Sequence, residues 1–223
     1  MKVNVRLFAA VRERAGSARV EVELTPGAKV GDVWPLLDLG DEPAGMLYAV
    51  NRAYADRSEA LTDGDEIAVI PPVSGGTDAP SGSEPQSRFA LSEEPLSVDA
   101  VVAEVRGADA GAIATFIGTT RAHSRGREVL YLDYEAYEGM AEQVMADLAD
   151  ELKRRHELCT VAIHHRVGRV DIGEMSVVIA VSAAHRAPAL AACAEAIDEL
   201  KVSVPLWKKE TYVGGEEWIG QGS

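Results

Sequence analysis

Residues 66–87 read EIAVIPPVSGGTDAPSGSEPQS, and this stretch decides how the chain is divided. It opens with a strand-like run and passes through Gly75-Gly76. From residue 77 onward it holds no hydrophobic residue except one alanine. Such a composition cannot bury a core and is typical of a flexible linker. We therefore predict a first domain at residues 1–76, a linker at 77–87 and a second domain at 88–223.

The part before the linker has the pattern of an α+β roll. Alternating apolar and polar residues predict strands, and a longer apolar periodicity predicts a helix in which Val33, Leu36 and Leu37 point inward. The expected elements are strands at 3–8, 19–24, 48–51 and 66–70, a short helix or turn at 9–15, a helix at 30–39 and a turn at 61–65. Two strands, a helix and two strands within about 70 residues predict a β-grasp, ubiquitin-like domain.

The part after the linker mixes helices and strands. Helices are expected at 98–105 with Ser97 as N-cap, at 139–156, and at 187–201 with Leu190, Cys193, Ala194, Ile197 and Leu200 on one face. Strands are expected at 111–118, which reads as buried, and at 159–167, 175–182 and 206–213. The whole chain is therefore expected to be α+β.

Charge and composition argue against nucleic-acid, membrane and metal partners. The chain has 36 acidic and 22 basic residues, a net charge of −14, which repels the backbone of nucleic acids. No apolar run approaches the length of a membrane span, and no signal peptide is recognised, so we expect a cytoplasmic protein. Cys159 and Cys193 have no metal-binding spacing and are interpreted as packed thiols.

Gly75-Gly76 is the first candidate for chemistry. Without side chains the two residues form a slim tail that fits a narrow tunnel, and no Cβ crowds the carbonyl of Gly76. A diglycine is also an ordinary way to begin a linker, and the sequence alone leaves both interpretations open.

Basic residues are concentrated in the second domain. Four short segments hold four of the five histidines and the cations Arg121, Arg125, Arg127, Arg166, Arg169, Arg186, Lys201, Lys208 and Lys209. If the fold brings these segments together, they form a positive pocket for a small phosphorylated substrate. Arg125, Arg127 and Lys209 are interpreted as solvated surface cations.

Residues 1–76 resemble the small subunit of molybdopterin synthase. The resemblance is carried by Leu7-Phe8-Ala9, Asn51, Asp63-Gly64-Asp65 and the final Gly-Gly. In that family an adenylating and sulfurating enzyme converts the last glycine to a thiocarboxylate, which donates sulfur. The resemblance therefore implies that Gly76 is the sulfur carrier, with Gly75 as part of the carrier tail.

Residues 88–218 resemble the large subunit of the same enzyme, which implies an α/β hammerhead-type domain. The matching strings are FIGTTR (116–121), YEAYEGM (134–140), HRVG (165–168), SAAHR (182–186), LK (200–201) and VPLWKKE (204–210). The family's substrate is cyclic pyranopterin monophosphate, which becomes the dithiolene of molybdopterin. Arg121, His185 and Arg186 are the candidates to hold its phosphate and pterin.

The resemblance also assigns the catalytic groups. The family's two functional lysines match Lys201, the main catalytic group, and Lys208, which supports it electrostatically. A lysine that is close to other cations and partly desolvated has a lowered pKa and can act near neutral pH. Trp207, Tyr137 and Met140 are expected either to wall the pterin or to pack in the core.

The chain departs from the family at Gly76, whose carbonyl forms an amide with Thr77. We therefore predict proteolytic cleavage after Gly76. The family also implies a homodimer through the second domain, in which Arg121, His185 or Arg186 completes a neighbour's site. No cofactor and no metal are expected, because the histidines lack ligand spacing. A carrier or binding module without catalysis, and a pterin storage protein, remain the alternatives.

Overall fold

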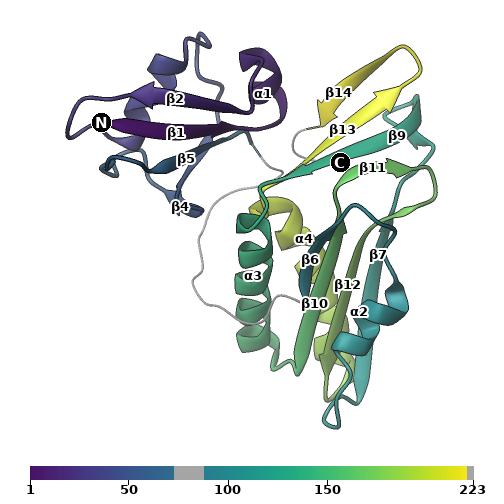
Figure 1. Cartoon of the computed structure of the whole chain (residues 1–223). Helices are drawn as coiled ribbons and strands as arrows, with labels where there is room; N and C mark the ends of the chain where they lie inside the picture. Colours follow the sequence, from purple (N-terminus) through teal and green to yellow (C-terminus); the bar gives the residue numbers. More distant parts are fainter. Residues whose placement is uncertain (73–87, 220–223) are drawn as a thin grey trace. The chain divides into compact units, whose positions relative to one another are not determined.

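A computed structural model of the chain describes residues 1–72 and 88–219 (Figure 1). The chain divides into two compact units, Met1–Val73 and Ser74–Ser223. Gly75, Gly76 and the expected linker at 77–87 lie outside the described residues.

The first unit is built on one five-stranded sheet with the order β2-β1-β5-β3-β4. Strand β1 runs antiparallel to β2 and parallel to β5, which is the arrangement of a β-grasp fold. The ubiquitin-like prediction is therefore confirmed. The elements are β1 (Lys2–Leu7), α1 (Ala9–Ala15), β2 (Arg19–Glu23), η1 (Val30–Asp32), η2 (Trp34–Leu37), β3 (Leu47–Val50), β4 (Ala53–Ala55) and β5 (Glu66–Ile70).

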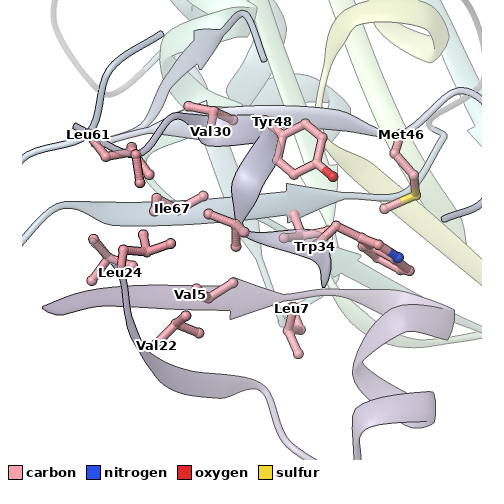
Figure 2. Close-up of a cluster of buried hydrophobic side chains, with 14 of the residues drawn as sticks. Val5, Leu7, Val22, Leu24, Val30, Trp34, Met46, Tyr48, Leu61 and Ile67 are labelled. Atoms are coloured by element: carbon pink, nitrogen blue, oxygen red, sulfur yellow. The ribbon is translucent and has the colours of Figure 1, made fainter. Parts of the chain in front are cut away.

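Alternate residues of these strands form the core of the first unit. Val5 and Leu7 of β1 lie with Val22 of β2 and Ile67 of β5 in one buried cluster (Figure 2). Trp34 completes the cluster, and its indole nitrogen donates to the Gly40 carbonyl at 2.9 Å. The period-two pattern in the sequence therefore predicted the inward faces of these strands correctly.

The prediction of one continuous helix at 30–39 is wrong. Two short 3-10 helices, η1 and η2, replace it, and Leu36 is 52 % exposed where we expected it to point inward. Pro35 lies in the first turn of η2, where its missing N–H is tolerated but its ring interrupts a longer helix. Trp34 fills the core in place of Leu36.

The second unit contains a four-stranded sheet with the order β6-β10-β12-β7. Helix α2 packs on Ala162, Val178 and Ala180. The alternate residues Ile163 and Ile179 point to the other face, which α3 and α4 cover (Figure 1). The elements are β6 (Phe89–Ser92), α2 (Val98–Glu104), β7 (Ala112–Thr119), α3 (Met140–His156), β10 (Thr160–Arg166), β12 (Met175–Ala183) and α4 (Arg186–Ser203). The expected α2 cap is confirmed, since the Ser97 side chain accepts from the Ala100 N–H.

A second antiparallel sheet, with the order β11-β9-β13-β14, lies beside the first within this unit. Its strands are β9 (Arg127–Ala136), β11 (Gly168–Asp171), β13 (Leu206–Tyr212) and β14 (Gly215–Ile219), and the short β8 (His123–Ser124) pairs with β9. Only β13 was expected from the sequence. The combination of strands and helices confirms the predicted α/β character of this part.

Two burial predictions in the second unit are wrong. Strand β7 alternates instead of being buried, because it is the edge strand and only one of its faces is covered, so that Ile113 is 38 % and Ile117 42 % exposed. In α4, Leu190 is 62 % exposed, and the buried stripe runs through small residues such as Ala189, Ala192 and Ala196. Cys193, Ile197 and Leu200 are buried as expected, whereas Ala194 is exposed like Leu190, so the buried face lies further toward the alanines than predicted.

Candidate active site

Lys201, Lys208 and Arg121 come together in the second unit, each from a different element. Lys201 lies in the last turn of α4, Lys208 in β13, and Arg121 directly after β7. The charges of Lys201 and Arg121 both act on the Lys208 ammonium. Three side chains from separate segments therefore form one cationic group, which we call the lysine cluster.

The end of α4 explains why the two lysines meet. Pro205 has no N–H to continue the helix, and the Val204 N–H closes it on the Leu200 carbonyl at 3.2 Å. Strand β13 then begins at Leu206, so the chain reverses within a few residues of Lys201. Lys208 follows on the returning strand and lies near the helix end.

Backbone hydrogen bonds fix the segment that carries Arg121. The Thr120 N–H donates to the Glu174 carbonyl at 3.0 Å, and the Thr120 carbonyl accepts from the Gly173 N–H at 2.8 Å. Arg121 itself is exposed and follows immediately. The turn before β12 therefore holds the end of β7 in place and presents the guanidinium group.

Lys208 is largely withdrawn from water, with its side chain 18 % exposed. Its ammonium lies 3.2 Å from a carboxylate oxygen of Glu210. The pKa of Lys208 lies below its ordinary value, chiefly because burial disfavours the charge; Lys201 and Arg121 lower it further, and Glu210 opposes them. Such a lysine loses its proton more readily than an exposed one.

Tyr134 lies next to Lys208, because β9 pairs Tyr134 with Lys208 across the sheet. Burial raises the pKa of its hydroxyl, which hydrogen-bonds Ser176, so the phenol stays neutral. Its ring meets His165 edge to face with 4.9 Å between centroids. Burial lowers the pKa of His165 to about 4, so this imidazole is neutral and packs in the core.

His185 and Arg186 lie far from the lysine cluster of the same chain. They stand at the N-cap and the first residue of α4, and both are exposed. Lys201 is fifteen residues further along that helix, a distance of about 22 Å along its axis. Within one chain, therefore, Arg121 joins the lysines, whereas the other two candidate substrate ligands do not.

Arg166 and Arg169 contribute no cation to the lysine cluster. Arg166 is 5 % exposed, and it donates to the Arg169 carbonyl at 2.9 Å and lies 3.6 Å from Glu174. The Arg169 guanidinium lies over the Tyr131 ring and donates to Asp171. Both charges therefore have partners within the fold, and the gathering of all the basic segments into one pocket stays a prediction.

The remaining candidates are structural. Tyr137, Met140 and Trp207 are 0 %, 1 % and 5 % exposed, which confirms the packed-core interpretation of these residues. Arg127 is half exposed and lies over the Tyr212 ring. Interpreting Lys209 as a solvated cation was wrong, because its side chain is 17 % exposed and pairs with Glu216 at 2.9 Å. Cys193 is buried, which raises the pKa of its thiol to about 11, as expected of a packed cysteine.

Sequence reasoning missed Glu210, which is 3 % exposed and in direct contact with Lys208. The signal was present in the string KKETY, where Lys208, Glu210 and Tyr212 alternate on one face of a strand. A buried carboxylate beside a buried lysine is a functional feature that this period-two spacing identifies.

Within residues 1–72 and 88–219, no group of three His, Cys, Asp or Glu side chains is arranged to hold a metal ion. The helices of this described part include none that is both long and apolar enough to span a membrane.

Comparison with known proteins identifies the second unit. Residues 91–203, slightly more than half of the chain, match the family model described as MoaE protein. The molybdopterin synthase catalytic subunit of Halalkalibacterium halodurans is 47 % identical over 133 residues, which cover 60 % of this chain and 85 % of that protein. The chain belongs to the MoaE family. It is thus a sulfur-transferring enzyme of molybdenum cofactor biosynthesis.

Other MoaE relatives agree. The human molybdopterin synthase catalytic subunit is 44 % identical over 127 residues, covering 57 % of this chain and 68 % of that protein. The crystal structure of Staphylococcus aureus molybdopterin synthase superimposes with a TM-score of 0.59 at 34 % identity, over 60 % of this chain and 98 % of that one. Residues 5–76 match the model of the ThiS family. The chain therefore joins a sulfur-carrier domain and a MoaE domain in one polypeptide.

Proposed function

We propose that this chain transfers sulfur from a thiocarboxylate on Gly76 to cyclic pyranopterin monophosphate, forming the dithiolene of molybdopterin. The lysine cluster is the observation that carries this proposal. It concentrates three positive charges in a chain whose net charge is −14. An anionic substrate and an anionic sulfur donor are both attracted to such a site.

Lys201 is the main catalytic group in this proposal, and Lys208 supports it. Once the thiocarboxylate sulfur has bonded to the substrate, water attacks the Gly76 carbonyl, the carbon–sulfur bond breaks, the sulfur stays on the substrate and Gly76 leaves as a carboxylate. Negative charge develops on the carbonyl oxygen during this attack. An ammonium group held in a partly dehydrated site stabilises that charge far better than bulk water does. The burial of Lys208 beside Lys201 and Arg121 supports this assignment.

The carrier must be released before it can be loaded. Because Gly76 is followed by Thr77, its carbonyl belongs to a peptide bond and cannot be converted to a thiocarboxylate while that bond is intact. Cleavage after Gly76 exposes a carboxylate, which a separate adenylating and sulfurating enzyme then converts to the thiocarboxylate. Gly75 and Gly76 form the tail that enters the site.

The phosphate and pterin are bound by Arg121 together with His185 and Arg186. Since α4 separates the last two from Lys201 by about 22 Å, they serve the lysine cluster of a second copy of the chain. A homodimer through the second domain provides that arrangement. A structure determined for the Helicobacter pylori molybdopterin-converting factor is a complex of its subunits 1 and 2, which supports association of a carrier part with a catalytic part and not the homodimer itself.

The test compares the chain cut after Gly76 with the uncut chain, each given the pterin substrate and a sulfurating system. We expect molybdopterin from the cut chain alone. Substrate binding without any sulfur transfer from a loaded carrier would instead favour the storage alternative. Transfer by the uncut chain at the same rate would show that cleavage is not needed.

A further inference from the structure

A buried hydrogen-bonded chain lies behind Lys208. Glu210, 3 % exposed, places one carboxylate oxygen 3.2 Å from the Lys208 ammonium. Its other oxygen accepts a hydrogen bond from the Tyr212 hydroxyl, and the Ser124 hydroxyl also hydrogen-bonds this carboxylate. Glu210, Tyr212 and Ser124 therefore extend this chain from the Lys208 ammonium along β13 to β8.

We propose that Glu210 is a positioning residue for Lys208 and that Tyr212 and Ser124 hold Glu210 in place. The proposal rests on the function proposed above, since it concerns how the lysine cluster is kept ready for sulfur transfer. It assigns a role to three residues that do not touch the reacting atoms.

The strand explains the spacing. Lys208, Glu210 and Tyr212 are alternate residues of β13, so their side chains leave the same face. Ser124 reaches them from β8, which pairs with the start of β9. Tyr212 is anchored in turn, because it packs with Val129 and Leu132 and the Arg127 guanidinium lies 3.4 Å from its ring centroid. Glu210 is therefore held by groups that are themselves fixed.

Charge explains why Lys208 needs this support. The groups that face it include Lys201 from α4, Arg121 after β7, Tyr134 from β9 and Glu210 on its own strand. Lys201 and Arg121 are cations that repel the ammonium, and Tyr134 is neutral. Glu210 supplies the negative charge that opposes the lowering of the Lys208 pKa and holds the ammonium against the repulsion of its positive neighbours.

The chain keeps Glu210 ionised although it is buried. Burial by itself raises the pKa of this carboxyl, but the hydrogen bonds from Tyr212 and Ser124 and the charge of Lys208 outweigh burial, so the pKa lies below its ordinary value. The Tyr212 hydroxyl keeps its proton, because burial and the hydrogen bond to Glu210 raise its pKa. A donor that stays protonated beside a carboxylate that stays ionised is a stable arrangement over a wide pH range.

The test measures how readily Lys208 is acetylated by acetic anhydride at a series of pH values, in the full-length chain, with mass spectrometry of each lysine. Glu210→Gln removes the charge but keeps the shape, and we expect the midpoint of Lys208 labelling to fall by about one pH unit or more. Glu216→Gln is the matched control, since Glu216 pairs with Lys209 at 2.9 Å and its side chain is 56 % exposed. It should leave the Lys208 midpoint unchanged.

Turnover provides the second readout. Tyr212→Phe keeps the ring under Arg127 but removes the hydroxyl, and we expect kcat to fall about tenfold while KM changes little, because the loss acts on the transition state. Glu210→Gln should move the pH profile of kcat in the same direction as the labelling midpoint. Thermal unfolding of each variant excludes a loss that comes from misfolding alone, and Tyr212→Phe remains informative if Glu210→Gln does not fold.

Two outcomes would overturn the proposal, and they differ. An active wild-type enzyme whose folded Glu210→Gln and Tyr212→Phe variants keep its labelling midpoint, kcat and pH profile would remove the positioning role alone. A wild-type enzyme that transfers no sulfur at all would remove the proposed function, and this role with it.

Discussion

Adjacent residues of one strand have separate tasks in this protein. Lys208 and Lys209 are neighbours in sequence, yet Lys208 faces Glu210, Lys201 and Arg121, while Lys209 lies near the Trp218 ring and pairs with Glu216. The pleat of β13 sends the two ammonium groups to opposite faces. A basic pair that looks uniform in sequence therefore contains one residue of the lysine cluster and one that is engaged on the opposite face of the strand.

Arg121 should contribute mainly to substrate binding. Arg121→Ala removes a charged donor for the substrate phosphate, a contact usually worth about 1.5–3 kcal/mol, so we expect KM to rise roughly 10- to 100-fold. Steady-state kinetics with the pterin substrate measure this change. Arg125→Ala, at an exposed turn, is the control and should leave KM unaltered. An unchanged KM for Arg121→Ala would remove this residue from the binding site.

His165 should make the fold sensitive to acid. Its pKa is about 4 in the folded chain and about 6.5 when unfolded, so below pH 6.5 the unfolded state binds a proton that the folded state does not. Stability is therefore complete above pH 6.5 and falls by about 3 kcal/mol as the pH drops to 4. Urea unfolding at several pH values tests this, and His165→Phe should lose that part of the dependence. Equal slopes for wild type and variant would contradict it.

At the level of helices and strands, the periodicity of the sequence predicted where most elements lie, but it did not always predict the kind of element or its buried face. The strands β1, β2, β5, β10 and β12 and the helices α2, α3 and α4 are all near their expected positions. The prediction failed where tertiary packing overrides local pattern, as at Pro35 in η2 and at Leu190 on α4. It also missed β9 and β11, which form strands because they pair with each other across a long separation, and β14, which pairs with β13 through a short turn.

At the candidate site, too, some residues were predicted from the sequence and others were found only in the structure. The resemblance to a family supplied Lys201, Lys208 and Arg121, which the fold brings together. The period-two spacing in KKETY places Glu210 on the face of Lys208, although the sequence reasoning did not use it. Tyr134 was not indicated, because its place beside Lys208 depends on which strands become neighbours. Sequence reasoning also expected Arg121, His185 or Arg186 to complete a neighbour's site, and the length of α4 separates His185 and Arg186 from Lys201 within one chain.

The junction between β7 and the segment before α4 should tolerate no side chain at Gly111. A Cβ built there would lie 2.3 Å from the Ala184 carbonyl oxygen, which is backbone and cannot move aside easily. We expect Gly111→Ala to destabilise the second unit by about 1–3 kcal/mol, as overpacking generally does. Gly107→Ala is the matched control, because a Cβ at that position meets nothing within 4 Å. Denaturant unfolding compares the two, and equal midpoints would contradict the expectation.

On the scale of the whole molecule, a sulfur donor and its acceptor enzyme are parts of one translation product. The match of residues 5–76 to the ThiS family and of residues 91–203 to the MoaE family places both functions on the chain. Synthesis as one chain provides the two parts in equal amounts. It also makes release of the Gly76 carboxylate a necessary step in our proposal, since Thr77 follows it.

We therefore expect the active enzyme to contain two polypeptides. Intact-mass measurement on protein purified from its native host should find one fragment that ends at Gly76 and another that begins at Thr77. A Gly76→Pro variant should resist the cut and lose sulfur transfer. Only full-length chain in a fully active preparation would contradict cleavage.

The central claim is that the lysine cluster drives sulfur transfer from Gly76, and a single-turnover measurement tests it most directly. Residues 1–76 carrying a Gly76 thiocarboxylate are mixed with the second part of the chain and the pterin substrate, and sulfur loss is followed by mass spectrometry. We expect rapid loss with the wild type, and a rate about 100- to 1000-fold lower with Lys201→Ala or Lys208→Ala, as when a transition-state charge loses its partner. Lys209→Ala should behave as wild type. Sulfur loss at the wild-type rate from the Lys201→Ala and Lys208→Ala proteins would contradict the account.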